Sequence, residues 1–384
     1  NIGMKEIYLD NSATTPLSEE VLAAMTPYLT GNFGNPDSLH SYGRSAVKAV
    51  DEARDLIAEC LHAKSNEIYF TSGATESDNW ALKGTLAASK KGKHALVSSI
   101  EHPALIKPAN YLKTRGYDID FIPADKSGII DVDFLKRSVR GDTVIVCCMT
   151  ANNEIGTIQP VDEVVKAAKS VGAYAMTDAV QAVGALDISV DKTGVDMLSL
   201  SAHKFYGPKG VGLLYVKTGV KIDPLVEGGE QERKKRGGTT NVAGVVGMSV
   251  ALKRAIDDRE TNSAKILALR ERFVDEVLSG ISGVKLNGDR EKRLPLNADF
   301  SFEGVNGEAL LYNLDLAGIA ASNGSACSSG TVEPSHVLSA IGLSAKEASS
   351  SVRFTFGKNN TAEEVDFAAK TLKICVERLR NLQK

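Results

Sequence analysis

The feature that most constrains the fold of this chain is a repeated alternation of short apolar runs with amphipathic segments of helical period, from about residue 67 to residue 220. The apolar runs lie at 67–70, 94–100, 118–122, 143–149, 174–177, 195–201 and 211–216. Such alternation predicts a mostly parallel sheet covered by helices on both faces. Ligands bind such sheets at the carboxyl ends of the strands, so we expect the functional site there.

The flanking segments predict further helices and a second, smaller unit. Helices are expected at 18–29, 45–61, 242–259 and 265–278, and the last third predicts strands at 297–302 and 351–356 with helices at 306–316, 334–341 and 361–382. A chain of 384 residues is long enough for two domains. We therefore expect an α/β fold with a large sheet domain over 15–260 and a smaller α+β domain formed by 1–14 and 261–384.

Composition excludes several classes of protein. Hydrophobic residues make up 43% and charged residues 24% of the chain, the balance of a soluble globular protein. The net charge of −3 gives no electrostatic case for binding nucleic acid. The basic run 233–236 follows three glutamates and is expected to be a solvated loop. No apolar run approaches the roughly 20 residues of a membrane span, and no signal-peptide pattern is present, so we expect a cytoplasmic protein.

The five cysteines show no framework spacing. Their number is odd and no Cys-x-x-Cys pair occurs, which argues against a disulfide scaffold or a zinc site, and no metal is expected. Cys60, Cys147, Cys148 and Cys375 lie in apolar strand or helix patterns and are expected to be small core residues. Cys327 differs, because it lies in a loop of small polar residues, 322–330.

One lysine stands at the mouth of a predicted buried strand, in the segment Ser199-Leu-Ser-Ala-His-Lys-Phe-Tyr-Gly-Pro-Lys-Gly-Val-Gly212. Partial burial favours the neutral amine, which makes Lys204 a candidate for Schiff-base chemistry. Ser201 and His203 precede it and could donate hydrogen bonds to a phosphate. The alternative is a solvated surface lysine, the usual place of this residue type.

Other strand ends carry polar residues of matching chemistry. Thr75 follows a glycine at a predicted helix start, which indicates either an anion site or an ordinary helix cap by Ser72 or Thr75. His102 precedes a proline that can begin a helix and could stack on a planar ligand or move protons. Asp178 would, if buried, need a cationic partner such as a protonated pyridine nitrogen, and Gln181 could reach the phenolic oxygen of the same ring.

Together these residues favour pyridoxal 5′-phosphate (PLP) as the cofactor. They supply a Schiff-base lysine, an acid for the ring nitrogen, a stacking histidine and a phosphate cradle. A nicotinamide nucleotide fits less well, because no G-x-G-x-x-G follows a strand.

Motifs spread along nearly the whole chain also resemble a known family. They are Leu9-Asp-Asn-Ser-Ala-Thr-Thr-Pro16, Thr71-Ser-Gly-Ala-Thr-Glu76, Glu101-His102, Asn152-Asn-Glu-Ile-Gly156, Asp178 with Gln181, Ser201-Ala-His-Lys-Phe-Tyr-Gly-Pro-Lys-Gly210, Arg236-Gly-Gly-Thr239, Ser325-Ala-Cys-Ser-Ser329 and Arg353-Phe354. In this order they resemble a cysteine desulfurase of the NifS/IscS type, a class V member of the fold-type I PLP enzymes.

The resemblance implies a role for each matching residue. Lys204 would anchor PLP, Asp178 would pair with the pyridine nitrogen, Gln181 would contact the phenolic oxygen, and His102 would stack on the ring and transfer protons. Ala74, Thr75, Ser201 and His203 would hold the phosphate, with Thr239 reaching the phosphate of the other subunit of a homodimer. Asn153 and Arg353 would bind the α-carboxylate of L-cysteine.

By the same resemblance Cys327 would be the nucleophile that takes the sulfur as a persulfide and leaves L-alanine. The sulfur would pass to an iron–sulfur scaffold or another acceptor protein. Two alternatives stay open at this point. An aminotransferase or selenocysteine lyase of the same fold would not need Cys327, and a non-catalytic scaffold for iron–sulfur assembly would need neither Cys327 nor Lys204.

Overall fold

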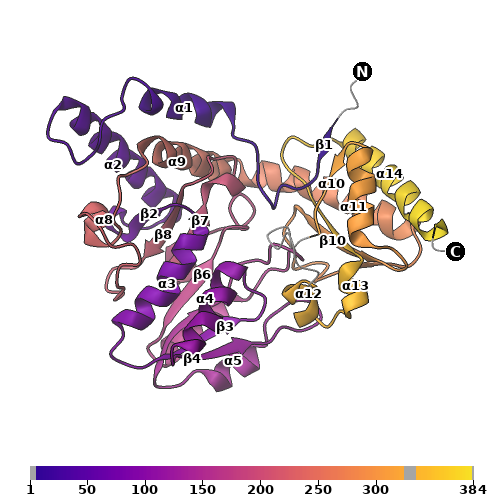
Figure 1. The fold of residues 1–384 in the computed structure, drawn as a ribbon, viewed down its shortest axis with the longest axis horizontal. Helices are drawn as coiled ribbons and strands as arrows, with labels where there is room; N and C mark the ends of the chain where they lie inside the picture. Colours follow the sequence, from indigo (N-terminus) through magenta and orange to yellow (C-terminus); the bar gives the residue numbers. More distant parts are fainter. Residues whose placement is uncertain (1–5, 324–333, 383–384) are drawn as a thin grey trace.

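A seven-stranded sheet forms the larger part of the molecule (Figure 1), seen here in a computed structural model that describes residues 6–323 and 334–382. The strand order is β2-β8-β7-β6-β5-β3-β4. Neighbours from β7 to β4 are parallel, and β8 is antiparallel to both β7 and β2. The strands are β2 (Ile68–Thr71), β3 (His94–Ser98), β4 (Asp118–Ile122), β5 (Thr143–Cys147), β6 (Tyr174–Asp178), β7 (Met197–Ser201) and β8 (Gly212–Val216). The predicted mostly parallel sheet is confirmed.

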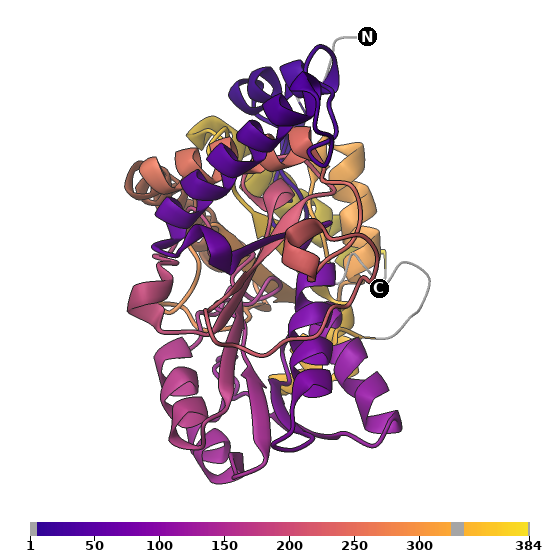
Figure 2. The ribbon, with the colours of Figure 1, turned by 90° about the vertical axis from the view of Figure 1, so that its left-hand side faces the viewer.

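Helices cover both faces of this sheet, as Figure 2 shows from the side. Successive side chains of a strand point to opposite faces. Leu96 of β3 therefore belongs to the core on one face, which also holds side chains of α2 (Ser41–Leu61), α6 (Val161–Ser170) and α9 (Val242–Asp257). Its neighbours in β3, Ala95 and Val97, pack on the other face with α3 (Ala74–Ala88) and α4 (Pro103–Thr114). Burial on both faces explains why these strands read as continuous apolar runs.

The C-terminal part has a core of its own. Its sheet has the order β12-β10-β9, from β9 (Val284–Leu286), β10 (Asn297–Phe302) and β12 (Ser351–Thr355). Its helices are α10 (Arg259–Gly280), α11 (Gly307–Leu316), α12 (His336–Ala340), α13 (Ala345–Ser349) and α14 (Ala362–Asn381). Phe273, Phe300 and Phe354 are fully or almost fully buried in the centre of this core.

The N-terminal segment belongs to the C-terminal part in space, although it begins the chain. Strand β1 (Ile7–Tyr8) pairs in parallel with β11 (Ile319–Ala320), on the right-hand side of Figure 1. Ile7 and Leu9 join the core that holds Phe273. The domain division at 15–260 against 1–14 with 261–384 stays a prediction, and this strand pairing is what such a division would require.

The remaining helices are α1 (Glu19–Leu29), α5 (Val132–Ser138), α7 (Val190–Thr193) and α8 (Gln231–Lys234). Helix α8 corrects the expectation that 233–236 is a solvated loop. Glu232 is buried there and accepts hydrogen bonds from both terminal nitrogens of Arg54, and Arg236 is paired with Glu76 of α3. Arg233 and Lys234 are exposed, so the expectation holds only for the first two residues of the run.

Four cysteines occupy the core positions expected of them or lie close to them. Cys147 and Cys148 are fully buried, Cys375 is buried in α14, and Cys60 is half-buried in α2. Burial raises the pKa of Cys60 to about 11, so its thiol stays protonated near neutral pH. Within residues 6–323 and 334–382, no helix is long and apolar enough to cross a membrane.

Candidate active site

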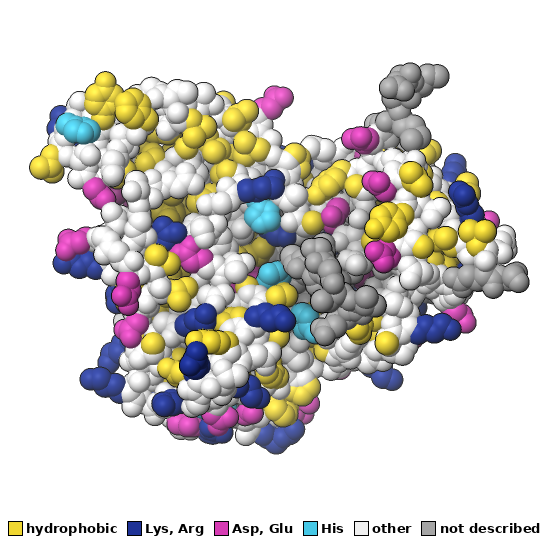
Figure 3. Space-filling view, viewed as in Figure 1, with side chains coloured by type: hydrophobic (Ala, Val, Ile, Leu, Met, Phe, Trp, Pro, Cys, Tyr) yellow, Lys and Arg dark blue, Asp and Glu magenta, His cyan; other side chains and the backbone are white. Residues whose placement is uncertain are grey.

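The carboxyl ends of the parallel strands border a cavity of about 540 Å³. Every predicted site residue except Thr239 and Cys327 lines it. They are Ala74, Thr75, His102, Asn153, Asp178, Gln181, Ser201, His203, Lys204 and Arg353. In Figure 3, histidine side chains lie with lysine or arginine side chains near the middle of the molecule, where its two parts meet.

The first turn of α3 offers uncapped amides to this cavity. Its N-cap residue is Gly73, and no side chain makes a capping hydrogen bond there. The alternative that Ser72 or Thr75 caps this helix is therefore wrong. The first amides of a helix have no partner within it and attract anions, and Ala74, Thr75 and Glu76 all line the cavity. Gly212 permits this arrangement, because a Cβ there would lie 2.7 Å from the Cα of Gly73.

Ser201 and His203 stand across from that helix start, at the end of β7. Ser201 is buried, and a Cβ on Gly73 would lie 3.6 Å from its Oγ. His203 shares a hydrogen bond of 3.0 Å between Nδ1 and Oγ1 of Thr14. Burial and the charges of Lys204 and Lys209 lower the pKa of His203 to about 4, so this side chain is neutral at neutral pH. These residues could add neutral donors to an anion cradle.

Lys204 ends a short 3-10 turn, η2 (Ala202–Lys204), directly after β7. Its Nζ donates hydrogen bonds to the main-chain oxygens of Ser12 and Ala13, the latter at 2.8 Å. Lys204 is only partly exposed, so the alternative of a fully solvated lysine is wrong. The N-terminal motif thus places main-chain acceptors next to the candidate anchor.

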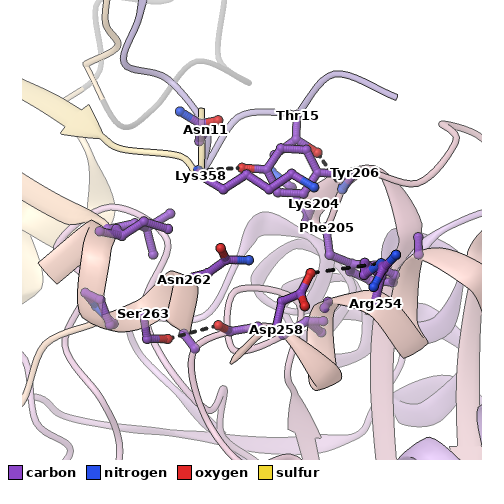
Figure 4. A pocket seen from close by; sticks show the side chains of 18 of the residues that line it. Asn11, Thr15, Lys204, Phe205, Tyr206, Arg254, Asp258, Asn262, Ser263 and Lys358 are labelled. Carbon is purple, nitrogen blue, oxygen red and sulfur yellow. Dashed lines mark hydrogen bonds and ion pairs between the residues drawn. The ribbon is translucent and has the colours of Figure 1, made fainter. Parts of the chain in front are cut away.

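A second cavity, of about 90 Å³, lies behind this lysine (Figure 4). Tyr206 and Lys358 form one side, where the main-chain N–H of Lys358 donates to the Tyr206 hydroxyl at 3.0 Å. Asp258, Asn262 and the junction of α9 with α10 form another. Among the described candidates at strand ends, only Lys204 lines both cavities. The other polar candidates line only the larger cavity. The chemistry therefore belongs to the larger cavity.

Asp178 is the last residue of β6 and is buried. Its Oδ1 accepts a hydrogen bond of 2.9 Å from the main-chain N–H of Val180. Burial raises the pKa of Asp178, while that hydrogen bond and the charge of His102 act in the opposite direction. Gln181 lies one turn further on and donates from Nε2 to the main-chain oxygen of Ser12 at 3.2 Å. An acid in this position needs a cation to ionise fully.

His102 is the N-cap residue of α4, ahead of Pro103 as expected. Its Nδ1 accepts a hydrogen bond of 3.1 Å from the main-chain N–H of Ala104, so the neutral ring carries its proton on Nε2. Burial lowers the pKa of His102, and the charge of Asp178 opposes this effect. A neutral imidazole in this position can exchange a proton at one defined atom.

Arg353 comes from β12 of the C-terminal part and reaches the same cavity. It is 2% exposed. Nη1 donates to the main-chain oxygen of Asn153 at 2.7 Å, Nη2 donates to Oδ1 of Asp10 at 3.0 Å, and Nε has no hydrogen-bond partner. A buried guanidinium with an unused donor suits a carboxylate ligand. Asn153 lines the cavity beside it.

Two predicted residues are not among those that line the cavity. Thr239 is exposed and lines a neighbouring hollow with Ser72, Gly210 and Arg236. Cys327 lies outside the described residues. The described residues on either side of it are fixed near the cavity. Ser322 pairs with Arg353 through main-chain hydrogen bonds, and the Ser335 hydroxyl donates to the Glu154 carboxylate.

The acids at this site to which sequence reasoning gave no role include Asp10, which is partly exposed, and Asp78, which is buried. Asp10 stands inside the quoted motif 9–16, and Asp78 follows Ala74 by one helical turn. That spacing places Asp78 on the same face of α3 as the residue bordering the anion cradle. The helical period could therefore have indicated it.

The residues present fit the predicted cofactor. The uncapped helix start matches a phosphate, and the buried Asp178 matches a pyridinium nitrogen. A buried oxygen of Asp78 and one of Glu101 lack any hydrogen-bond partner, so the described residues leave polar groups unsatisfied beside the cavity. The site thus offers complementary groups for both ends of PLP.

Comparisons with known proteins agree with this chemistry. The family "Aminotransferase class-V" matches residues 7–367. The cysteine desulfurase IscS of Dictyoglomus turgidum is 50% identical over 379 residues, which are 98% of this chain and 96% of that protein. A solved NifS-like protein superimposes with a TM-score of 0.92 at 36% identity, over 97% of this chain and all of that one. SspA, solved in complex with cysteine, gives a TM-score of 0.81 at 34% identity, over 93% of this chain and all of that one.

Proposed function

The chain belongs to the class-V aminotransferase family and is a PLP-dependent cysteine desulfurase, and from this premise we propose which of its residues carry the reaction. Lys204 anchors the cofactor, Arg353 binds L-cysteine, and Cys327 takes the sulfur. The observation that carries the proposal is that Lys204, Asp178, His102 and Arg353 line one cavity although they come from distant parts of the sequence.

The cofactor is held at both of its ends. The amides of Ala74 and Thr75 would hold the phosphate of PLP together with Ser201 and His203. Asp178 would pair with the ring nitrogen, and Gln181 would contact the phenolic oxygen. When bound, PLP supplies an electron sink for a negative charge that develops on the α-carbon of the substrate. The buried carboxylate of Asp178 stabilises the cationic ring nitrogen that this role needs.

The substrate is held by its α-carboxylate. The guanidinium of Arg353 is fixed by Asp10 and by the main-chain oxygen of Asn153, and its unpartnered Nε supports a free donor toward the ligand. Fixing the carboxylate places the α-carbon within reach of the lysine amine. Binding by a pre-oriented fork costs little side-chain entropy.

Proton movement uses two groups of defined position. Lys204 takes the proton from the α-carbon, and Ser12 and Ala13 hold its Nζ beforehand. His102 holds a proton on Nε2 and can deliver it to the product or accept it from the substrate thiol. Its lowered pKa keeps the ring mainly neutral near pH 7, which suits transfer in both directions.

The sulfur leaves on Cys327. The thiolate of Cys327 attacks the sulfur of L-cysteine, a sulfur–sulfur bond forms, the carbon–sulfur bond breaks, and a proton completes the methyl group of L-alanine. Ser322 is held beside Arg353, and five residues of chain span at most about 18 Å. This reach supports Cys327 as a group that can approach the substrate sulfur.

We further propose a cytoplasmic homodimer that passes the sulfur to an iron–sulfur scaffold or another acceptor protein, with Thr239 near the phosphate of the other subunit. The exposure of Thr239 beside the cradle supports this position. The described cysteines are free thiols, which suits a reducing compartment. We retain the division into domains 15–260 and 1–14 with 261–384 as part of the proposal.

The test is mass spectrometry of the protein after treatment with L-cysteine. We expect an added sulfur on the peptide that contains Cys327, and loss of alanine production in Cys327→Ser. Cys60→Ser is the matched control, because the raised pKa of the Cys60 thiol leaves little thiolate. Undiminished alanine production by Cys327→Ser would contradict the assignment and would mean that the sulfur leaves L-cysteine without forming a persulfide on Cys327.

A further inference from the structure

A buried acid that the reaction above does not use lies directly beside Asp178. Asp78 is fully buried in α3 and lines the cofactor cavity. One of its oxygens, Oδ2, has no hydrogen-bond partner. A fully buried, ionised carboxylate with an unpartnered oxygen would destabilise the folded protein.

The fold brings the two acids together through β7. Ser199 of β7 lies opposite Asp178 of β6 in the parallel register. The Ser199 hydroxyl donates a hydrogen bond of 2.5 Å to Oδ1 of Asp78, a residue of helix α3. One strand position thus places Asp78 next to the acid that faces the ring nitrogen.

The surroundings contain more acids than cations. Glu101 and Asp178 are the other buried acids, His102 and Lys204 are the bases that face them, and Cys147 lies below on β5. Burial raises the pKa of Asp78 well above its ordinary range, and the charge of Asp178 adds to this effect. Burial also raises the pKa of Glu101, to about 8. Two adjacent buried carboxyls cannot both ionise at low cost.

We propose that Asp78 is a positioning residue that keeps a proton and donates a hydrogen bond from it to Asp178, so that Asp178 stays ionised and aimed at the ring nitrogen of PLP. Ser199 fixes the other oxygen of Asp78 and thereby the direction of that donor. The proton gives Oδ2 of Asp78 the partner that it lacks when Asp78 is written as a carboxylate. The inference rests on the proposed placement of the cofactor ring over Asp178.

Two substitutions separate this role from simple space filling. Asp78→Asn keeps an oxygen for Ser199 and an N–H₂ donor for Asp178, but it cannot lose a proton. Asp78→Leu has a similar volume and no donor. If Asp78 acts as a hydrogen-bond donor, the asparagine variant keeps the PLP affinity that the leucine variant loses. If Asp78 acts as an ionised carboxylate, both variants lose PLP affinity.

The first measurement is the infrared band of un-ionised carboxyl groups, recorded with and without PLP near pH 7. We expect the wild-type protein to show a band that Asp78→Asn lacks. Glu101→Gln identifies the part of the signal that comes from Glu101. Equal bands in wild type and Asp78→Asn would overturn the proposal. This outcome does not depend on Cys327, so it is separate from a failure of the persulfide chemistry.

The second measurement is PLP binding, followed by the pH dependence of the visible cofactor band. We expect Asp78→Asn to bind PLP within about threefold of wild type, and Asp78→Leu to bind about tenfold more weakly with a shifted pH profile, as loss of one charge-assisted hydrogen bond predicts. Equal losses in both variants, or no loss in either, would overturn the proposal. If Asp78→Leu does not fold, the infrared comparison and the asparagine variant still decide it.

Discussion

Asp10 and Arg353 are joined by a hydrogen bond of 3.0 Å from Nη2 to Oδ1, although 343 positions separate them in the sequence. The contact ties the N-terminal segment to β12 and leaves the guanidinium fixed at the cavity. The Asp10 side chain is 18% exposed and the Arg353 side chain 3%. The hydrogen bonds from Nη2 to Asp10 and from Nη1 to the main-chain oxygen of Asn153 fix the plane of the guanidinium.

The first prediction concerns substrate binding. Arg353→Lys keeps the charge but loses the planar fork that contacts Asp10 and Asn153, so the KM for L-cysteine should rise about tenfold or more. The value of kcat should fall less, because the reacting groups on Lys204 and His102 are unchanged. Steady-state kinetics of alanine formation measure both constants.

The control for this change is Arg272→Lys. Arg272 is paired with Asp366 on the surface, with half of its side chain exposed, so its replacement should leave KM unchanged. An Arg353→Lys enzyme with the KM of Arg272→Lys would remove Arg353 from the substrate site.

Much of the large sheet could be predicted from the sequence. The strands are buried on both faces, so each reads as an apolar run bounded by polar residues, and the predicted bounds lie within a few residues of β2 to β8. The strand-end rule then predicts that Lys204, His102 and Asp178 meet at one edge of the sheet, and all three line one cavity. Local pattern was enough here, because each candidate stands at the end of its own strand.

The rest depended on contacts between distant segments. Nothing local indicates that Glu232 is buried against Arg54. The contact between Asp78 and Ser199 depends on the register that places Ser199 opposite Asp178. Contacts of this kind depend on packing and charge compensation between distant segments, which cannot be inferred from the local pattern of a single sequence.

The second prediction concerns the cofactor anchor. Lys204→Ala should lose the visible absorption of the lysine-bound cofactor and reduce alanine formation roughly a thousandfold, because the amine that moves the α-proton is removed. Lys217→Ala is the matched control, since Lys217 is an exposed lysine just beyond the neighbouring strand β8. Spectra and turnover of the two variants measure the effect, and a Lys204→Ala protein with the wild-type spectrum would disprove the assignment.

The third prediction concerns Glu101, whose pKa is raised by burial from 4.5 to about 8. Between these values the folded protein holds a proton that the unfolded chain has lost, so this residue makes the protein less stable as pH rises from about 4.5 to 8. Glu101→Gln keeps an oxygen that can accept from Ser98 and from Met149 and has no such proton. Relative to wild type, the free energy of unfolding of the variant should therefore rise by roughly 4 kcal/mol between about pH 5 and pH 8.5.

Denaturant midpoints at the two pH values measure this gain. The comparison uses the difference between variant and wild type, so the many other titrating groups cancel. A difference that stays constant with pH would mean that Glu101 is ionised in the folded protein.

The fourth prediction concerns the buried ion pair between Glu232 and Arg54. Glu232 also accepts from the main-chain N–H of Phe70 at 2.9 Å, and its side chain is 5% exposed. Glu232→Ala leaves Arg54 without its carboxylate, which costs about 3–5 kcal/mol in comparable buried pairs. Glu230→Ala, in the same turn, breaks only an exposed pair with Lys234 and should cost less than about 0.5 kcal/mol. Unfolding followed by the fluorescence of Trp80, the only tryptophan, measures the stability of both variants. Equal losses of stability in the two variants would show that the Arg54 contact does not hold α8 against β2.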